Sequence, residues 1–176
     1  MRQLYGRRDE EDEMFARTER LLLRPGFPED VPALAPAIAE ALLAYRSDPL
    51  LPSLLILERT EAEPRVVGIC GLRRRPSGSA ELRCWIAPEH RGRKLASEAC
   101  AALVDIARTL KLPIVHAIDR SDDPAAGRLL RRLGFVPGEI HAPRLHGRTG
   151  VGSGSRMMQL ELGHETEEDE HEPLAA

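Results

Sequence analysis

Aromatic side chains are scarce in this sequence, which has one Trp, two Tyr and three Phe among its 176 residues. A hydrophobic core in this chain must therefore be built mainly from Leu, Ala, Val and Ile. No apolar run in the sequence approaches the roughly 20 residues that a transmembrane helix needs, and the N-terminus lacks the apolar segment of a secretory signal peptide. We therefore expect a cytoplasmic protein with no membrane partner.

Cysteine is also infrequent. Cys70, Cys84 and Cys100 are odd in number and far apart in the sequence, which argues against a disulfide framework and a zinc pattern. Each cysteine lies in an apolar pattern, so we expect buried free thiols. His141 and His146 have no cysteine or carboxylate partner at the spacing of metal ligands, and we expect no metal site.

Charge of one sign does not dominate the chain. The formal net charge is −3, which argues against a general nucleic-acid-binding protein. Acidic residues are concentrated at both termini and arginines in the middle, so an RNA- or ribosome-binding module stays open as an alternative. The length suits one domain. We expect a disordered charged arm at 1–16, a folded domain at 17–163 and a disordered acidic tail at 164–176.

The most informative stretch runs from residue 81 to residue 99. Residues 81–87 alternate between apolar and polar side chains, which predicts a strand, and Pro88 ends it. A basic loop follows at residues 91–94, and the apolar spacing becomes helical from about Leu95. Free N–H groups at a helix start, together with the positive end of the helix dipole and nearby basic side chains, favour a polyphosphate ligand.

This stretch, WIAPEHRGRKLASEA, resembles the acetyl-CoA pyrophosphate loop of the GNAT N-acetyltransferases. The family pattern has Arg or Gln, any two residues, Gly or Ala, any residue, and Gly or Ala. Lys94 departs from the pattern, since a glycine or alanine usually stands there; the residues that fit are Arg91, Gly92, Arg93, Leu95 and Ala96. Residues 97–99 and the Leu-Gly-Phe at 133–135 further resemble the RimJ/RimL-type branch, which acetylates N-termini of ribosomal proteins. The resemblance covers roughly residues 17–162.

The order of predicted elements matches the fold that the resemblance implies. That fold is α/β, with a mixed, mostly antiparallel sheet of six to seven strands, about four helices, and a gap between the fourth and fifth strands that admits the cofactor. Pro36 is expected to break or bend the first helix, and residues 73–79 are predicted to form a hairpin loop. The patterns predict strands at 17–24, 54–59, 65–72, 81–87, 112–118, 135–140 and 156–162, and helices at 31–45, 95–110 and 125–133.

The resemblance also implies acetyl-CoA as co-substrate and a set of residues that bind it. A backbone N–H near residues 85–87 would polarise the thioester carbonyl. Trp85 has packing against apolar neighbours as an alternative role, and Asp123 is also predicted to cap the helix that follows it. The predicted cofactor-binding residues are Trp85, Ile86, Arg91, Gly92, Arg93, Lys94, Leu95, Ala96, Ser97, Asp123 and Arg128.

Two residues are candidates for the general base. Glu81 comes first, because a carboxylate in a mostly apolar cleft has a raised pKa and can accept a proton near neutral pH. The alternative is that Glu81 is a solvated strand residue without a catalytic role. His116, on the next strand, comes second, with a structural role as its alternative. The tyrosine by which many relatives protonate the leaving thiolate is replaced here by Leu130.

We therefore expect an N-acetyltransferase that moves an acetyl group from acetyl-CoA to a primary amine, as a monomer or homodimer. The resemblance favours a protein N-terminus as acceptor, and amino acids, polyamines and antibiotics stay open. Lys94, Asp123 and Leu130 motivate a rival hypothesis, in which a degenerate relative binds coenzyme A or a protein partner without catalysis.

Overall fold

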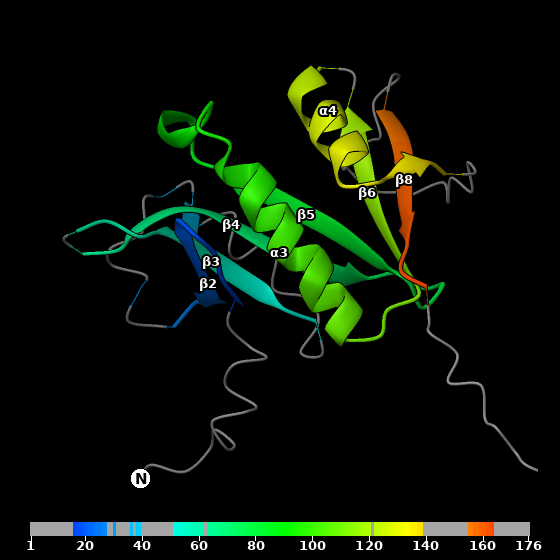
Figure 1. Ribbon diagram of the computed structural model, residues 1–176, viewed down its shortest axis with the longest axis horizontal. Coiled ribbons are helices and arrows are strands. Elements are labelled where there is room, and N and C mark those ends of the chain that lie inside the picture. The colour runs from blue at the N-terminus through cyan, green and yellow to red at the C-terminus, as the bar shows by residue number, and fades with distance from the viewer. Residues whose placement is uncertain are drawn as a thin grey trace, which may run out of the picture.

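The computed structural model describes residues 16–27, 30, 36, 38–39, 51–61, 63–120, 122–138 and 155–163. In these ranges one eight-stranded sheet has the order β1-β2-β3-β4-β5-β6-β8-β7, and two helices pack on it (Figure 1). None of the helices described there has the length and apolarity of a membrane span. The elements are β1 Ala16–Arg17, β2 Leu21–Pro25, β3 Ser53–Glu58, β4 Arg65–Arg74, β5 Ala80–Ile86, the 3₁₀-helix η2 Pro88–His90, α3 Leu95–Thr109, β6 Ile114–Arg120, α4 Pro124–Arg132, β7 Val136–Pro137 and β8 Ser155–Glu161.

The sheet is mixed and mostly antiparallel, as predicted. Every neighbouring pair of strands is antiparallel except β5 and β6. There is one strand more than predicted because a turn interrupts the first predicted strand. The Thr18 hydroxyl accepts a hydrogen bond from the Leu21 amide at 2.9 Å, and the chain reverses so that Ala16 lies opposite Leu23. Ala16 therefore belongs to the sheet, one residue before the predicted start of the domain.

Several predicted boundaries differ from the structure. β4 continues to Arg74, so the predicted loop at 73–79 is too long; the Arg75 amide donates to the Ser79 carbonyl, and only a tight turn remains. β7 has two residues in place of the six predicted, although residues 139–140 lie outside the described ranges. Of the helix predicted at 31–45, Pro36, Ile38 and Ala39 are helical, and the rest lies outside the described residues.

Two apolar clusters occupy the two faces of the sheet. On one face, α3 packs its buried residues against the central strands, because its apolar side chains recur at helical spacing. This cluster contains Phe135, the largest fully buried side chain among the described residues. On the opposite face a smaller cluster brings together Ile38, Leu55, Leu57, Ile69 and Ala87, with Trp85 packed against it. The core is mainly aliphatic, as the composition predicts.

The predicted gap in the sheet lies between β5 and β6. These strands pair only at Ala80 with Val115 and at Glu81 with His116. Beyond those pairs the two strands separate, with α3 beside β5 and α4 beside β6 (Figure 1). The far half of β5 consequently has a free edge that faces the gap, and the loop after β5 leads to the start of α3.

Candidate active site

The loop between η2 and α3 has the geometry of an anion-binding cradle. Gly92 and Lys94 adopt positive φ angles of 76° and 62°, and α3 begins directly afterwards at Leu95. Within the described residues, the amides from Gly92 to Ala96 have no hydrogen-bond acceptor in the protein. These N–H groups and the positive end of the α3 dipole can therefore bind an anionic ligand.

Lys94, which departs from the family pattern, occupies the N-cap of α3 in the left-handed region. Its carbonyl accepts hydrogen bonds from the Ser97 and Glu98 amides at 3.1 and 3.3 Å, which starts the helix. A glycine is favoured at this backbone conformation, because a side chain there costs about 1–2 kcal/mol. The lysine is nevertheless accommodated and exposed, so the loop keeps its shape despite the departure.

Neighbouring elements hold the basic loop in place. Arg91 Nε donates to the Ile86 carbonyl at 2.9 Å, which ties the loop to the end of β5. Arg93 forms a two-pronged ion pair with Glu58 of β3, and Arg20 donates to the Arg93 carbonyl at 3.1 Å. Arg91 and Arg93 therefore have structural partners within the protein. Their binding to a phosphate stays a prediction.

Glu98, in the first turn of α3, is the second anchor of this loop. Its carboxylate accepts hydrogen bonds from the Thr18 hydroxyl, and from the Arg20 amide and Arg20 Nε, both at 2.8 Å. Burial raises the pKa of Glu98, but the hydrogen bonds from Thr18 and Arg20 outweigh burial and lower that pKa below its ordinary value. We did not predict this role, since nothing in the sequence pairs residues that are 78 positions apart.

Along β5, the backbone groups that face the gap can be identified from the register. The Ala87 amide donates to the Val67 carbonyl of β4 at 3.0 Å. Alternate residues of a strand point their N–H groups in opposite directions, so the Cys84 and Ile86 amides point away from β4, toward the gap. Of the predicted polarising amides, Ile86 is therefore the best placed. The alternative reading of Trp85 is confirmed, because this side chain packs against the apolar cluster.

Glu81 and His116, the two base candidates, meet where the gap closes, as neighbours in the β5–β6 register. Glu81 is buried and contacts three guanidinium groups: Arg73 at 2.7 Å, Arg83 at 3.4 Å and Arg75 at 3.7 Å. The expected apolar surroundings of Glu81 are therefore wrong. Strand alternation places Arg73 and Arg83 on the face of Glu81, and the tight hairpin brings Arg75 beside them.

His116 has the properties of a neutral imidazole. Its ring is partly buried, and Nδ1 is buried without a hydrogen-bond partner among the described residues. Burial lowers the pKa of His116 below its ordinary value; the positive charge of Arg75 lowers it further, and Glu81 partly opposes them. An unprotonated histidine is suited to accept a proton at neutral pH.

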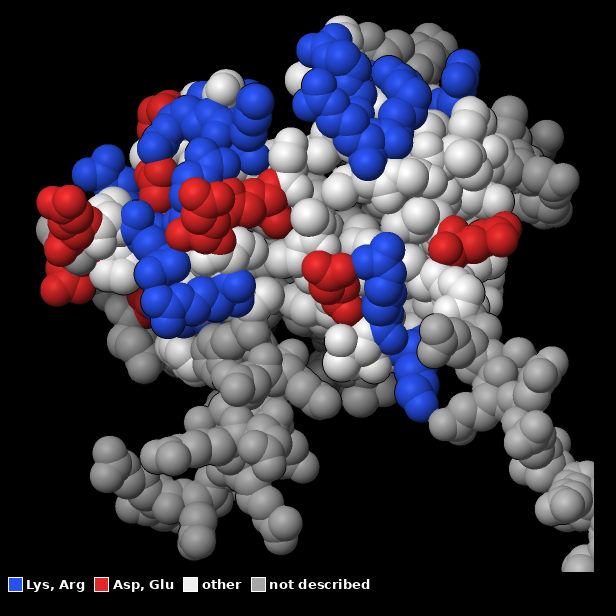
Figure 2. Space-filling view, viewed as in Figure 1, with Lys and Arg blue, Asp and Glu red and all other residues white. Residues whose placement is uncertain are grey.

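The other wall of the gap is formed by β6 and α4. Asp123 caps α4 by accepting a hydrogen bond from the Ala126 amide at 3.1 Å, as predicted. Arg128 is exposed on α4, where basic side chains gather across from those near the start of α3 (Figure 2). Leu130 is 4% exposed and belongs to the core. The position of the family tyrosine is thus filled by packing, and it supplies no acid.

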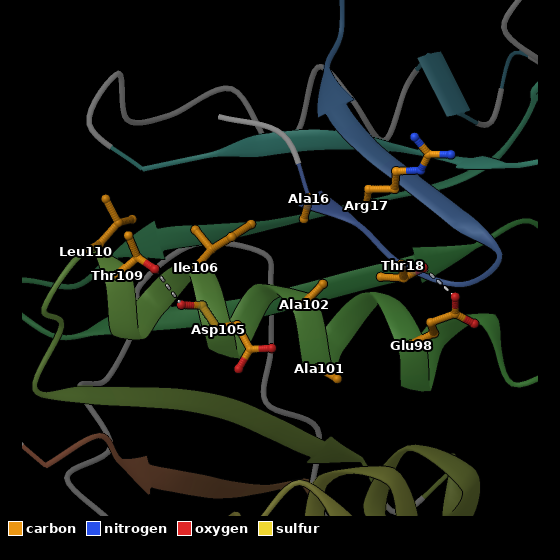
Figure 3. A pocket seen from close by; sticks show the side chains of 10 residues that line it. All are labelled: Ala16, Arg17, Thr18, Glu98, Ala101, Ala102, Asp105, Ile106, Thr109 and Leu110. Carbon is orange, nitrogen blue, oxygen red and sulfur yellow. Dashed lines mark hydrogen bonds between the residues drawn. The ribbon is translucent and has the colours of Figure 1, made fainter. Parts of the chain in front are cut away.

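A separate hollow of about 550 Å³ lies beside β1 on the outer side of α3 (Figure 3). None of the predicted site residues lines it. Its walls are formed by Ala16, Arg17, Thr18, Glu98, Ala101, Ala102, Asp105, Ile106, Thr109 and Leu110. The candidate active site is therefore the gap between β5 and β6, together with the cradle at α3.

Comparison with known proteins identifies the family of this fold. Residues 38–136 match the model of the Acetyltransferase (GNAT) domain. No curated protein sequence matches the chain. Among solved structures, an acetyltransferase from Agrobacterium tumefaciens str. C58 has 22% identity and a TM-score of 0.63, and covers 84% of this chain and 94% of its own.

Two other solved structures show the same fold. A GNAT-family acetyltransferase from Bacillus anthracis has 14% identity and a TM-score of 0.63, over 85% of this chain and 99% of its own. A spermidine N-acetyltransferase from Vibrio cholerae, in complex with CoA and spermine, has 19% identity and a TM-score of 0.60, over 82% of this chain and 97% of its own. Because the domain match spans more than half of the sequence, and the sheet has the splayed strands of that fold, this chain belongs to the GNAT family of acetyltransferases.

Proposed function

We propose that the chain binds acetyl-CoA between β5 and β6 and transfers its acetyl group to a primary amine. The observation that supports this most directly is the continuity between the free edge of β5 and the cradle of open amides at α3. An extended pantetheine arm would pair with the Cys84 and Ile86 backbone as an added strand does. Its diphosphate would then lie against the amides of 92–96.

The charged groups around the cradle complete the cofactor site. Lys94 is an exposed cation at the N-cap of α3 and would contact one phosphate through its ammonium. Leu95, Ala96 and Ser97 would contribute mainly backbone. Arg128, on the opposite wall, would attract the nucleotide end of the cofactor. Asp123 is engaged in capping α4, so its contribution to this site would be the position of that helix.

The transfer step uses groups at two places along the gap, the Ile86 amide on the free half of β5 and His116 where the gap closes. The amine nitrogen attacks the thioester carbonyl, and the Ile86 amide stabilises the oxyanion that forms. His116 accepts the proton that the amine loses through a chain of water molecules, because Ile86 lies five residues, or about 16 Å of strand, from Glu81, the neighbour of His116. The carbon–sulfur bond then breaks, and coenzyme A leaves as a thiolate that takes its proton from water, since Leu130 offers none.

Glu81 would act mainly through its neighbours. Three guanidinium groups contact this carboxylate, so it has ion-pair partners in place of the apolar surroundings that the sequence suggests. The surroundings therefore reverse the predicted order of the two base candidates. Glu81 would hold Arg73, Arg75 and Arg83 close to the site, where their charge favours the neutral form of an incoming amine.

The test of this proposal is a titration with acetyl-CoA followed by an assay of thiol release. Micromolar binding, with release of free coenzyme A on addition of primary amines, supports the enzyme. Binding without turnover for any amine would support the degenerate, CoA-binding rival. An absence of binding, together with retention on RNA that falls steeply with salt, would instead support the RNA-binding alternative.

A further inference from the structure

We infer that one ordered water molecule, the bridging water, binds between Ser53 and Arg73 and makes Ser53 a positioning residue for the proposed acetyl transfer. The bridging water holds the Arg73 guanidinium in the orientation in which it pairs with Glu81, the neighbour of His116. The kinetic part of this inference rests on the proposed function, whereas the water can be tested without any substrate.

The first observation is a pair of buried polar atoms. Ser53 Oγ and Arg73 Nε are buried and have no hydrogen-bond partner among the described residues. The Arg73 side chain as a whole is 43% exposed, so other parts of it reach solvent while Nε does not. An unpaired buried donor destabilises the folded state, and nearly all buried polar atoms have a protein or water partner. These two atoms therefore call for a shared partner.

The second observation is a small cleft that both residues line. Its volume is about 10 Å³, which is room for one water molecule and for nothing larger. Ser53 lies opposite Gly71 in the β3–β4 register. Arg73 follows Gly71 by two residues and lies on the same face of β4. Gly71 also lines the cleft, and its missing side chain leaves the space open.

The Pro52 carbonyl supplies a third partner for the water. A Cβ added at Gly71 would stand 2.7 Å from the Pro52 oxygen, so this oxygen lies beside the cleft. It accepts a hydrogen bond from the Leu72 amide at 2.9 Å and has a second lone pair. A water here accepts hydrogen bonds from Ser53 Oγ and Arg73 Nε and donates one to Pro52. About three hydrogen bonds are typical of a buried water.

The bridging water affects the reaction because it restrains a planar group that also contacts Glu81. Arg73 Nη2 donates to Glu81 Oε2 at 2.7 Å. The guanidinium is rigid, so a contact that fixes Nε also fixes the direction of Nη2. Glu81 is the register neighbour of His116. The orientation of Arg73 therefore determines how much of the Glu81 charge acts on His116.

The charged groups near His116 set the direction of the expected effect. Within the described residues, the residue opposite His116 on β8 is uncharged. The charged groups are Glu81, which raises the pKa of His116, Arg75, which lowers that pKa, and Arg73 and Arg83, which contact Glu81. If Arg73 loses its fixed orientation, Glu81 is less compensated, and the pKa of His116 should rise. The inflection in kcat/KM should then move to higher pH.

A crystal structure of the wild-type protein tests the water directly. We expect one ordered water at roughly 2.5–3.2 Å from Ser53 Oγ, Arg73 Nε and the Pro52 oxygen. In Ser53→Ala the water should lose occupancy, and the Arg73 guanidinium should adopt several orientations. A cleft without water density, or a protein group bonded to both Ser53 Oγ and Arg73 Nε, would overturn the inference whether or not the chain is an enzyme.

Two single variants and their combination test the positioning role. Ser53→Ala removes the hydroxyl, and Arg73→Lys keeps the positive charge but removes Nε. Each should move the inflection in kcat/KM to higher pH. The double variant should move it no further than the larger single shift, because both residues act through one water. Ser53→Thr keeps the hydroxyl on a side chain that suits a strand, so it should keep the wild-type pH profile.

Thr60→Ala is the control, because it removes an exposed hydroxyl just beyond the other end of β3. Its pH profile should equal that of wild type. A wild-type profile for Ser53→Ala, or additive shifts in the double variant, would overturn the positioning role. Failure of the wild-type protein to acetylate any amine would overturn the proposed function instead, and the crystal structure would still decide whether the water is bound.

Discussion

Glu81 lies directly beside His116 in the last pair of residues that joins β5 to β6. The two side chains have different surroundings. Three arginines form ion pairs with Glu81, whereas burial and the charge of Arg75 lower the pKa of His116 below its ordinary value. A carboxylate engaged by arginines and an imidazole with a lowered pKa are thus adjacent at the point where the gap ends, and an imidazole of this kind is suited to accept a proton from an amine.

The first prediction concerns the pH dependence of acetyl transfer. Since the pKa of His116 lies below its ordinary value of 6.5, kcat/KM should rise with pH and level off at an inflection below 6.5. His116→Gln should remove that inflection and lower kcat by roughly a hundredfold at neutral pH, the usual contribution of a general base. Acetyl-CoA affinity, measured by calorimetry, should change little.

Glu81→Gln is the matched test for the neighbouring residue. It should also lower kcat, because the arginines lose their counter-charge, but the inflection that belongs to His116 should remain and move lower, since Glu81 raises that pKa. If His116→Gln keeps both the rate and the inflection while Glu81→Gln removes them, Glu81 is the base and the order inferred here is wrong.

The free energy of unfolding should also depend on pH through His116. The folded protein binds a proton at His116 less readily than the unfolded chain does, so wild type should lose stability as pH falls through about 6.5. We expect the difference in free energy of unfolding between pH 7 and pH 5.5 to be smaller in His116→Gln, measured by urea unfolding. An equal loss in both proteins would show that His116 is not responsible.

A further prediction concerns Glu98, which joins α3 to the turn before β2. Its pKa is lowered in the folded state, so its contribution to stability is present above the unfolded pKa and is lost as pH falls through the folded one. Glu98→Gln should reduce the free energy of unfolding at pH 7 by about 1.5–3 kcal/mol, the range for hydrogen bonds to a charged group. The difference should shrink at pH 4 and below.

Asp105→Asn is the control on the same helix. Asp105 forms an ion pair with Arg108 at 2.6 Å, but both side chains are exposed, and such pairs contribute little. We expect a change of less than about 0.5 kcal/mol at either pH. A loss from Asp105→Asn that equals the loss from Glu98→Gln would show that general helix electrostatics, and not the anchor to Thr18 and Arg20, sets the stability.

Strands and helices such as β5 and α4 could be predicted from the sequence, because residues within each element specify it. Alternation defines β5, and the Asp123-Pro124 start and Gly134 stop define α4 within one residue. The turn at Thr18 was missed because its hydroxyl, and not a glycine or proline, reverses the chain. A side-chain hydrogen bond of this kind leaves little trace in an apolar pattern.

The surroundings of the site could not be predicted in the same way. The sequence predicts that Glu81 and Leu82 lie on opposite faces of one strand. The arginines that contact Glu81, however, come from β4, from the hairpin and from β5 itself. The anchors of the loop likewise join Arg20 to Glu98 and Arg93 to Glu58. Charge balance around a residue depends on register across strands, which a single sequence does not reveal.

The cysteines give a prediction that needs no substrate. Burial raises the pKa of the Cys70 thiol, and a hydrogen bond with Cys100 followed by burial raises the pKa of the Cys84 thiol. All three cysteines are free. In the native protein at pH 8, they should react with a thiol reagent far more slowly than after unfolding in guanidinium, when three should react. Rapid titration of any native thiol would contradict the burial described here.

Lys94 provides the sharpest test of the cradle, because it combines a strained backbone with a charge. Lys94→Gly should remove the cost of the left-handed backbone conformation, which is about 1–2 kcal/mol for a residue with a side chain. The glycine also gives the unfolded chain more conformational freedom, which lowers stability by about 0.5–1 kcal/mol. We expect a net gain in stability of roughly 0.5–1 kcal/mol, measured by urea unfolding. Lys111 has a φ of 52° and lies beyond the other end of α3, so Lys111→Gly is a matched control for the backbone effect.

The two glycine variants should differ in how they bind acetyl-CoA. If the Lys94 ammonium contacts a phosphate, Lys94→Gly should change affinity only slightly and flatten its salt dependence, because the cradle amides remain. Lys94→Glu should weaken binding by about 1–2 kcal/mol, close to one charge-assisted contact, and Lys111→Gly should have no effect on binding. Calorimetry at low and high salt measures all three. If wild type fails to bind at millimolar acetyl-CoA while Lys94→Gly binds tightly, Lys94 blocks the cradle, and the proposed acetyl transfer by this chain is wrong.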